Sequence, residues 1–212
     1  MSYTAIGSER RGVPPRPSAD GDSNAGDHAP GGTLGWSARL SDGTEVYLRP
    51  VTPSDKGRLA EGLEGLSAGS RYFRFFTNKR RFSGDELRYL TEVDGLDHVA
   101  LGVLDTEGRG LGVGRFIRMD GGVAEVAITV VDAMQGRRVG QLLLWALLHA
   151  ARGRQVTTFR FAILSGNVAM RRLVKSFGGE YRGREGDVEL FELDTAIARP
   201  HASQPDAAAQ AP

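Results

Sequence analysis

The chain has 212 residues, with 27 lysines and arginines against 26 aspartates and glutamates, so its formal net charge is +1. This balance gives no general attraction to nucleic acid or to an anionic membrane. The sequence has no cysteine, which excludes disulfides, thiolate catalysis and cysteine-based metal sites. No stretch reaches the length of a membrane span and no apolar secretory segment begins the chain, so we expect a cytoplasmic protein.

Both ends of the chain have the composition of tails. Residues 1–34 are rich in proline, glycine, serine and aspartate, and residues 197–212 are similar. Such segments bury too little apolar surface to offset their conformational entropy, so we predict that both are disordered. The segment between them, residues 35–196, is long enough for one domain with a single core.

The domain begins with a strand and a helix. Residues 44–49 alternate in polarity, which predicts a strand. A helix should open at Pro53, since Leu59, Leu63 and Leu66 recur at helical spacing and would bury one face. A later helix should begin at residue 83, where a serine and a glutamate have the spacing of a capping box.

The segment 71–82 interleaves aromatic residues with five basic ones. This composition is found on surfaces that bind single-stranded nucleic acid. The helical spacing of Tyr72, Phe73 and Phe76 is better explained by packing in the core, with the basic groups in solvent. We therefore predict no nucleic-acid partner.

The second half of the domain alternates strands and helices. Three runs joined by hairpin-like turns predict an antiparallel meander: 98–104, 111–118 and 123–131. The apolar helix 141–151 then leads to a strand over 157–164, and a connection of that length favours a parallel pair. The helix 167–177 and a hairpin over 181–193 complete a mixed sheet with helices on both faces.

A turn with two arginines lies between the third of these strands and the apolar helix. It consists of Gln135, Gly136, Arg137, Arg138, Val139 and Gly140. A strand, such a turn and a helix in this order aim free backbone N–H groups and the positive end of a helix dipole at one point, which attracts phosphate. The two guanidinium groups add forked donors that suit phosphate oxygens.

This turn resembles the acyl-CoA-binding motif of the GNAT superfamily of N-acetyltransferases, with Gln135, Val139 and Gly140 at matching positions. Arg138 stands where the motif has its first glycine. Residues 48–55 and 167–179 also resemble the family, and residues 66–76 are similar to a segment of bacterial protein-lysine acetyltransferases. The resemblance covers residues 44–193 and implies an α/β (α+β) fold. We expect a mixed central sheet of six to seven strands with an antiparallel first half and one parallel pair at the acyl-CoA site.

The resemblance also implies a substrate and its contacts. Acetyl-CoA would be the acyl donor, and no metal is implied. Its pantetheine arm would pair with backbone exposed between parallel strands, which points to Ile128 and Val130. Backbone N–H groups around residues 127–129, including that of Thr129, would stabilise the oxyanion. The turn 135–140 would hold the pyrophosphate. Asn167 is either only a helix N-cap or also a cofactor contact, and the basic residues of 71–82 could contact the substrate or the 3′-phosphate.

Glu125 is the candidate general base. An ordinary glutamate at the start of a strand faces water, but the neighbours of this one are apolar. Partial burial would raise its pKa from a reference of about 4.3, as the deprotonation of an ammonium group near neutral pH requires. In several GNAT enzymes a glutamate at this distance from the motif has that role.

The sequence thus predicts an N-acetyltransferase that transfers an acetyl group to a primary amine, with a protein lysine as first choice and small-molecule amines next. It implies no particular oligomeric state. The rival hypothesis is a non-catalytic acyl-CoA-binding module. Two departures from the family pattern favour the rival: Arg138, and Val174 where a tyrosine often protonates the departing thiolate.

Overall fold

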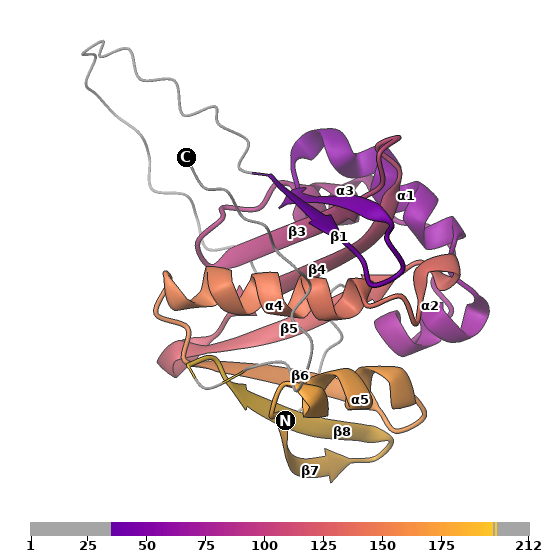
Figure 1. The fold of residues 1–212 in the computed structure, drawn as a ribbon. Helices are drawn as coiled ribbons and strands as arrows, with labels where there is room; N and C mark the ends of the chain where they lie inside the picture. Colours follow the sequence, from indigo (N-terminus) through magenta and orange to yellow (C-terminus); the bar gives the residue numbers. More distant parts are fainter. Residues whose placement is uncertain (1–34, 197, 199–212) are drawn as a thin grey trace, which may run out of the picture.

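The computed structural model describes residues 35–196 and residue 198, which form one eight-stranded sheet with helices on both faces (Figure 1). The strands are β1 (Trp36–Arg39), β2 (Glu45–Pro50), β3 (His98–Leu104), β4 (Gly110–Arg118), β5 (Val123–Val130), β6 (Thr158–Leu164), β7 (Glu180–Glu185) and β8 (Val188–Asp194). The helices are α1 (Lys56–Glu64), α2 (Ala68–Phe75), α3 (Gly84–Thr91), α4 (Val139–Arg152) and α5 (Val168–Ser176).

The strand order is β1-β2-β3-β4-β5-β6-β8-β7, and β5–β6 is parallel whereas the other pairs are antiparallel. This arrangement confirms the predicted mixed sheet with an antiparallel first half and one parallel pair. The described sheet has eight strands rather than six or seven because no sequence pattern predicts β1. That short edge strand buries none of its four residues, and Trp36 is 45% exposed.

Helix α4 forms the centre of the core on one face of the sheet. Its side chains Leu143 and Leu147 have no exposed surface. They pack over β4 at Gly112 and Gly114, where an added Cβ would lie 3.3 Å from a Leu143 atom and 3.0 Å from a Leu147 atom, respectively. The absence of side chains at these two glycines therefore lets the helix lie close to the sheet.

The opposite face of the sheet is covered by α1 and α3. Side chains alternate along a strand, so Val113 and Arg115 point away from α4. Both line a pocket together with Leu59 and Leu63 of α1. Helix α5 lies beside α4, since a Cβ on Gly140 would be 3.3 Å from a methyl group of Leu173, and Figure 1 shows both helices in front of the sheet.

A local signal in the sequence predicted the start of α3 correctly. The expected capping box begins α3: the hydroxyl of Ser83 accepts from the N–H of Glu86 at 3.2 Å, and the Glu86 carboxylate accepts from the N–H of Ser83 at 2.7 Å. No helix in the described part of the chain is both long and apolar enough to span a membrane.

The domain extends slightly past its expected end. Ala198 falls in the segment predicted as a tail, yet it is 5% exposed and its N–H donates to the carbonyl of Asp194 at 3.1 Å. The rest of the two expected tails, 1–34 and 197–212, lies outside the described residues.

Candidate functional site: a cleft between diverging strands

The parallel strands β5 and β6 are paired only at their beginnings. The register joins Val123 to Thr158 and ends where Glu125 meets Arg160. Beyond that point the strands diverge, and a cleft of about 650 Å³ opens between them. Residues 126–130 of β5 and 161–163 of β6 line this cleft, together with parts of α2, α4 and α5.

Backbone groups of β5 alternate between β4 and the cleft. The N–H of Val131 donates to the carbonyl of Leu111 at 3.0 Å, and the β4–β5 register runs without a shift, so odd-numbered residues turn their backbone groups toward β4. Ile128 and Val130 therefore present theirs to the open side. Thr129 lines the cleft as well, although its backbone faces β4.

The start of α4 lies at the same cleft, as the glycine-bearing turn predicts. The first hydrogen bond of the helix runs from the N–H of Leu142 to the carbonyl of Arg138, and no side chain caps this helix. The N–H groups of Val139, Gly140 and Gln141 are thus left for another acceptor, as expected for the first turn of a helix. All three residues line the cleft, so a phosphate there would meet both these donors and the helix dipole.

The turn needs left-handed backbone at two places. Gly136 has φ of 77° and Arg138 has φ of 68°. Glycine adopts this conformation freely, whereas it costs any other residue about 1–2 kcal/mol. The family motif has a glycine at the position of Arg138. Two reasons favour glycine there: the left-handed backbone, and the close approach of a phosphate.

Gln135 and Arg137 have structural partners. The amide of Gln135 donates to the Val130 carbonyl at 3.2 Å, which fastens the turn to the end of β5. The guanidinium of Arg137 is bound instead to Asp42 at 2.5 Å and to the hydroxyl of Thr44 at 2.9 Å. Every other residue predicted from this turn lines the cleft, but Arg137 does not.

Glu125 lies at the fork where β5 and β6 separate. Its side chain is partly buried, and within the described residues it has no hydrogen bond or ion pair. Burial raises the pKa of this carboxyl, while the positive charges of Arg74 and Arg160 lower it. Arg160 is already paired with Glu192 at 2.9 Å. A carboxylate that is desolvated and unpaired is suited to accept a proton.

Comparison with known proteins identifies the family of this domain. The chain matches the family model of the acetyltransferase (GNAT) domain over residues 45–180. It belongs to the GNAT acetyltransferase family.

Two curated relatives carry acetyltransferase names. Acetyltransferase Pat of Mycolicibacterium smegmatis is 34% identical over 163 residues, which cover 74% of this chain and 47% of that protein. Acetyltransferase PA5475 of Pseudomonas aeruginosa is 30% identical over 147 residues, which cover 68% of this chain and 79% of that protein. The chain therefore spans about half the length of its mycobacterial relative.

Solved structures show the same similarity. The GNAT domain of S. lividans PAT superposes with a TM-score of 0.72 at 31% identity, covering 76% of this chain and 96% of that domain. A cAMP-binding acyltransferase from Mycobacterium smegmatis gives a TM-score of 0.57 at 31% identity, covering 80% of this chain and 48% of the other. The S. lividans match thus covers nearly all of that GNAT domain.

The last helix of this GNAT domain contributes Asn167 to the cleft. Its side-chain oxygen accepts from the N–H of Met170 at 3.1 Å, so the residue is an N-cap, and it also lines the cleft. Val174 has no exposed surface and does not line the cleft. A valine at this position cannot donate a proton to a departing thiolate.

The interpretation of the aromatic residues in α2 as core residues is wrong. This helix has no buried residue, and Tyr72 is 48% exposed. Phe73 and Phe76 instead line the cleft, together with Ser70 and Arg74. Helical spacing identifies residues that share a face, but it does not distinguish a face packed in the core from one that forms the wall of a cleft.

Arg74 is a functional candidate that the sequence did not single out: the basic residues of 71–82 were predicted to be either solvated or in contact with the substrate or the 3′-phosphate. Burial lowers the pKa of its guanidinium to about 10, and the nearby Glu125 raises it. The run of basic residues in this segment was the available signal, but it does not say which of them points inward.

Within residues 35–196 and 198, no three or more histidine, aspartate or glutamate side chains form a group that could hold a metal ion.

Proposed function

We propose that this protein is an acetyl-CoA-dependent N-acetyltransferase that acts on a primary amine, with a protein lysine as the first candidate acceptor. The observation that carries the proposal is the divergence of β5 from β6 directly after Glu125. It brings open strand backbone, a desolvated carboxylate and a free helix start to one cleft. The likeness of residues 66–76 to protein-lysine acetyltransferases supports the choice of acceptor.

The residues of the cleft fit acetyl-CoA in three places. The first turn of α4 offers N–H donors for the pyrophosphate, joined by the side chain of Arg138. The open backbone of Ile128 and Val130 suits the amides of the pantetheine arm. Asn167 lies at the opposite wall and can contact the same arm. The site residues thus act as a group on one substrate.

The reaction follows from the positions of two groups on β5. Glu125, directly or through a water, removes a proton from the acceptor ammonium. The freed nitrogen lone pair attacks the thioester carbonyl, and the N–H of Ile128 stabilises the oxyanion that forms. The carbon–sulfur bond then breaks, and the new amide nitrogen loses its second proton to solvent. The released CoA thiolate takes a proton from solvent because Val174 has none to give.

The experiment is an assay of CoA release with acetyl-CoA and a panel of lysine peptides, polyamines and small amines. We expect turnover with at least one class of amine, and none of that turnover without the amine. Acetyl-CoA that binds but is not consumed with any acceptor would instead support a non-catalytic acyl-CoA-binding module. That alternative rests on Arg138 and on the buried Val174.

A further inference from the structure

A second, smaller pocket lies behind the cleft, between α1 and the sheet. Its volume is about 80 Å³, enough for a few water-sized groups and too small for a nucleotide or a large side chain. Apolar side chains form most of its wall, including Leu59, Leu63 and Leu90. Ala127, Thr129 and Arg74 line both this pocket and the cleft, so the two are neighbours.

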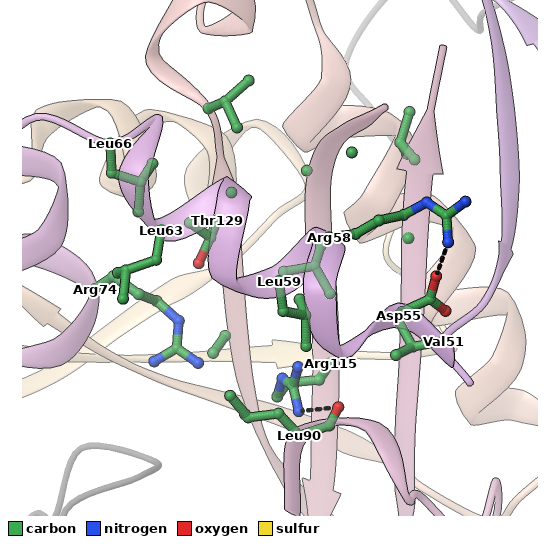
Figure 2. A pocket seen from close by; sticks show the side chains of 18 of the residues that line it. Val51, Asp55, Arg58, Leu59, Leu63, Leu66, Arg74, Leu90, Arg115 and Thr129 are labelled. Atoms are coloured by element: carbon green, nitrogen blue, oxygen red, sulfur yellow. Dashed lines mark hydrogen bonds and ion pairs between the residues drawn. The ribbon is translucent and has the colours of Figure 1, made fainter. Parts of the chain in front are cut away.

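Two guanidinium groups point into this small pocket. Figure 2 shows Arg74 entering from α2 and Arg115 from β4. Arg115 is 2% exposed, and its hydrogen bonds go to the carbonyl of Leu90 and to a ring nitrogen of His98, each at 3.2 Å. Neither partner carries negative charge: one is a backbone carbonyl and the other is a neutral imidazole, since burial and the charge of Arg115 lower the pKa of His98 to about 4.

Arg74 has even fewer partners. Throughout the described part of the chain its side chain makes no hydrogen bond and no ion pair, and its guanidinium lies 4.9 Å from the ring centre of Phe75. Burial lowers the pKa of both guanidinium groups, of Arg74 to about 10 and of Arg115 to about 9. Both therefore remain charged at neutral pH.

The charges at this end of the pocket do not balance. Arg74 and Arg115 are two cations. The carboxylate that interacts with Arg74 is Glu125, whose negative charge raises the pKa of the guanidinium. At the other end, Asp55 is bound by Arg49 at 2.6 Å and by Arg58 at 3.0 Å. A buried cation without an anionic partner, such as Arg115, is costly, and an anion that entered the pocket would relieve that cost.

We infer that Arg74 and Arg115 form a subsite for a carboxylate carried by one of the two reactants. The inference rests on the proposed function, since the subsite adjoins the fork at Glu125. A carboxylate between the guanidinium groups would place the rest of its molecule toward Ala127 and Thr129, which also line the cleft. It belongs either to an acidic acceptor or to an acyl chain that ends in a carboxylate.

The test compares substrates that differ only in that group. For the acceptor, lysine peptides with a neighbouring aspartate are compared with the same peptides containing asparagine. For the acyl chain, succinyl-CoA is compared with butyryl-CoA. We expect a preference for the carboxylate of about 10- to 100-fold in kcat/KM in one comparison, the range for a hydrogen bond to a charged group. The comparison that shows the preference identifies the reactant.

Arg74→Met tests the arginine itself. It should reduce that preference to near one and leave the unfolding midpoint equal to or above that of the parent, because a partly desolvated charge without an ion pair is removed. A structural arginine would behave in the opposite way, with lower stability and an unchanged preference. Arg81→Met is the matched control: it removes an exposed charge outside both pockets and should change neither quantity.

Binding is measured separately from turnover, so that the two proposals can fail independently. Sodium acetate, compared with sodium chloride at equal ionic strength, should raise the melting temperature of the parent more than that of Arg74→Met. An effect of Arg74 on acetate binding without any acyl transfer would support the subsite and contradict the proposed function. If parent and Arg74→Met respond alike to acetate and show the same substrate preferences, the subsite does not exist.

Discussion

At the scale of single residues, Glu125 is held where its charged form is disfavoured. Burial raises its pKa above the ordinary value of 4.5, although Arg74 and Arg160 oppose that shift. The apolar neighbours in the sequence predicted the burial. The two arginines come from segments far along the chain, 51 and 35 residues away in the sequence (125 − 74 and 160 − 125), so local patterns could not predict them.

Glu125→Gln should preserve acetyl-CoA binding and lower the acetylation rate by about 10²- to 10⁴-fold, the usual loss on removal of a general base. In the parent, the rate should increase with pH as Glu125 loses its proton, and the variant should lack this increase. Rate–pH profiles of both proteins check this. A variant with near-normal turnover and an unshifted profile would assign Glu125 a structural role.

The same substitution should affect stability in the other direction. Because the pKa of Glu125 is higher in the folded than in the unfolded state, the folded state binds more protons between the two values. Stability of the parent therefore decreases as pH rises through that window. Glu125→Gln has no such loss, so its urea midpoint at pH 7.5 should equal or exceed that of the parent. At pH 4 the difference should shrink; a variant less stable at both pH values would contradict this.

Arg138 combines an unfavourable backbone conformation with a charge at the cleft. Arg138→Ala should weaken acetyl-CoA binding by about 1.5–3 kcal/mol, the range for a hydrogen bond to a charged group, and higher salt should reduce the effect. Arg138→Gly also loses the charge but suits the backbone angle, so its binding should fall between those of the parent and the alanine variant. It should also be about 1 kcal/mol more stable than Arg138→Ala.

Titration calorimetry and urea unfolding of the three proteins measure both quantities. Tighter binding by Arg138→Ala would show that the arginine blocks the pyrophosphate site. That result would favour the non-catalytic alternative. The sequence located this residue in the motif, but its left-handed backbone became visible only in the structure.

At the scale of elements, periodicity predicted most strands and helices because each buries one face against the sheet. It failed for β1, whose four residues are an edge strand held by pairing with β2 and not by burial. It also misassigned the face of α2, since the wall of a cleft and the core use similar aromatic residues. Both errors concern elements at the margin of the core.

The packing of α4 on β4 depends on the absence of a side chain at Gly112. An added Cβ would lie 2.9 Å from the carbonyl oxygen of Thr129 and 3.2 Å from a methyl group of Val139. Gly112→Ala should therefore lower the free energy of unfolding by about 1–3 kcal/mol, as overpacking does. Urea unfolding measures the change.

The control is Gly57→Ala in α1, where an added Cβ would meet no atom within 4 Å. Alanine is the better helix former, so this substitution should increase stability by up to about 1 kcal/mol. Equal effects at the two positions would mean that β4 can shift to accept a side chain at Gly112.

At the scale of the whole molecule, the cleft is assembled from α2, β5, β6, α4 and α5, and binding acts on all of them together. Acetyl-CoA at 100 times its dissociation constant should add about 2.7 kcal/mol to the stability of the folded state. For a domain of this size, that corresponds to a rise in melting temperature of roughly 5–10 °C. A thermal scan with and without acetyl-CoA measures it. An equal rise with inorganic phosphate alone would contradict specific binding.

Contacts between distant segments limited what the sequence could predict at this scale. The guanidinium of Arg137 binds Asp42, 95 residues earlier, and is thereby withdrawn from the phosphate site to which the motif assigned it. The motif fixed the position of the backbone, whereas the partner of each side chain depended on the folded arrangement.

The alternation of β5 makes the two halves of the proposed chemistry inseparable. Even-numbered residues turn their backbone groups to the cleft. The odd-numbered place of Glu125 in the same strand determines the face of the sheet to which its side chain points. Inserting or deleting one residue at the start of β5, before Glu125, would exchange these assignments for every residue beyond the change. The donors for the acyl group and the base for the amine would then be misplaced together. Substitutions can alter either function gradually, but a change in the length of this strand would eliminate both in one step.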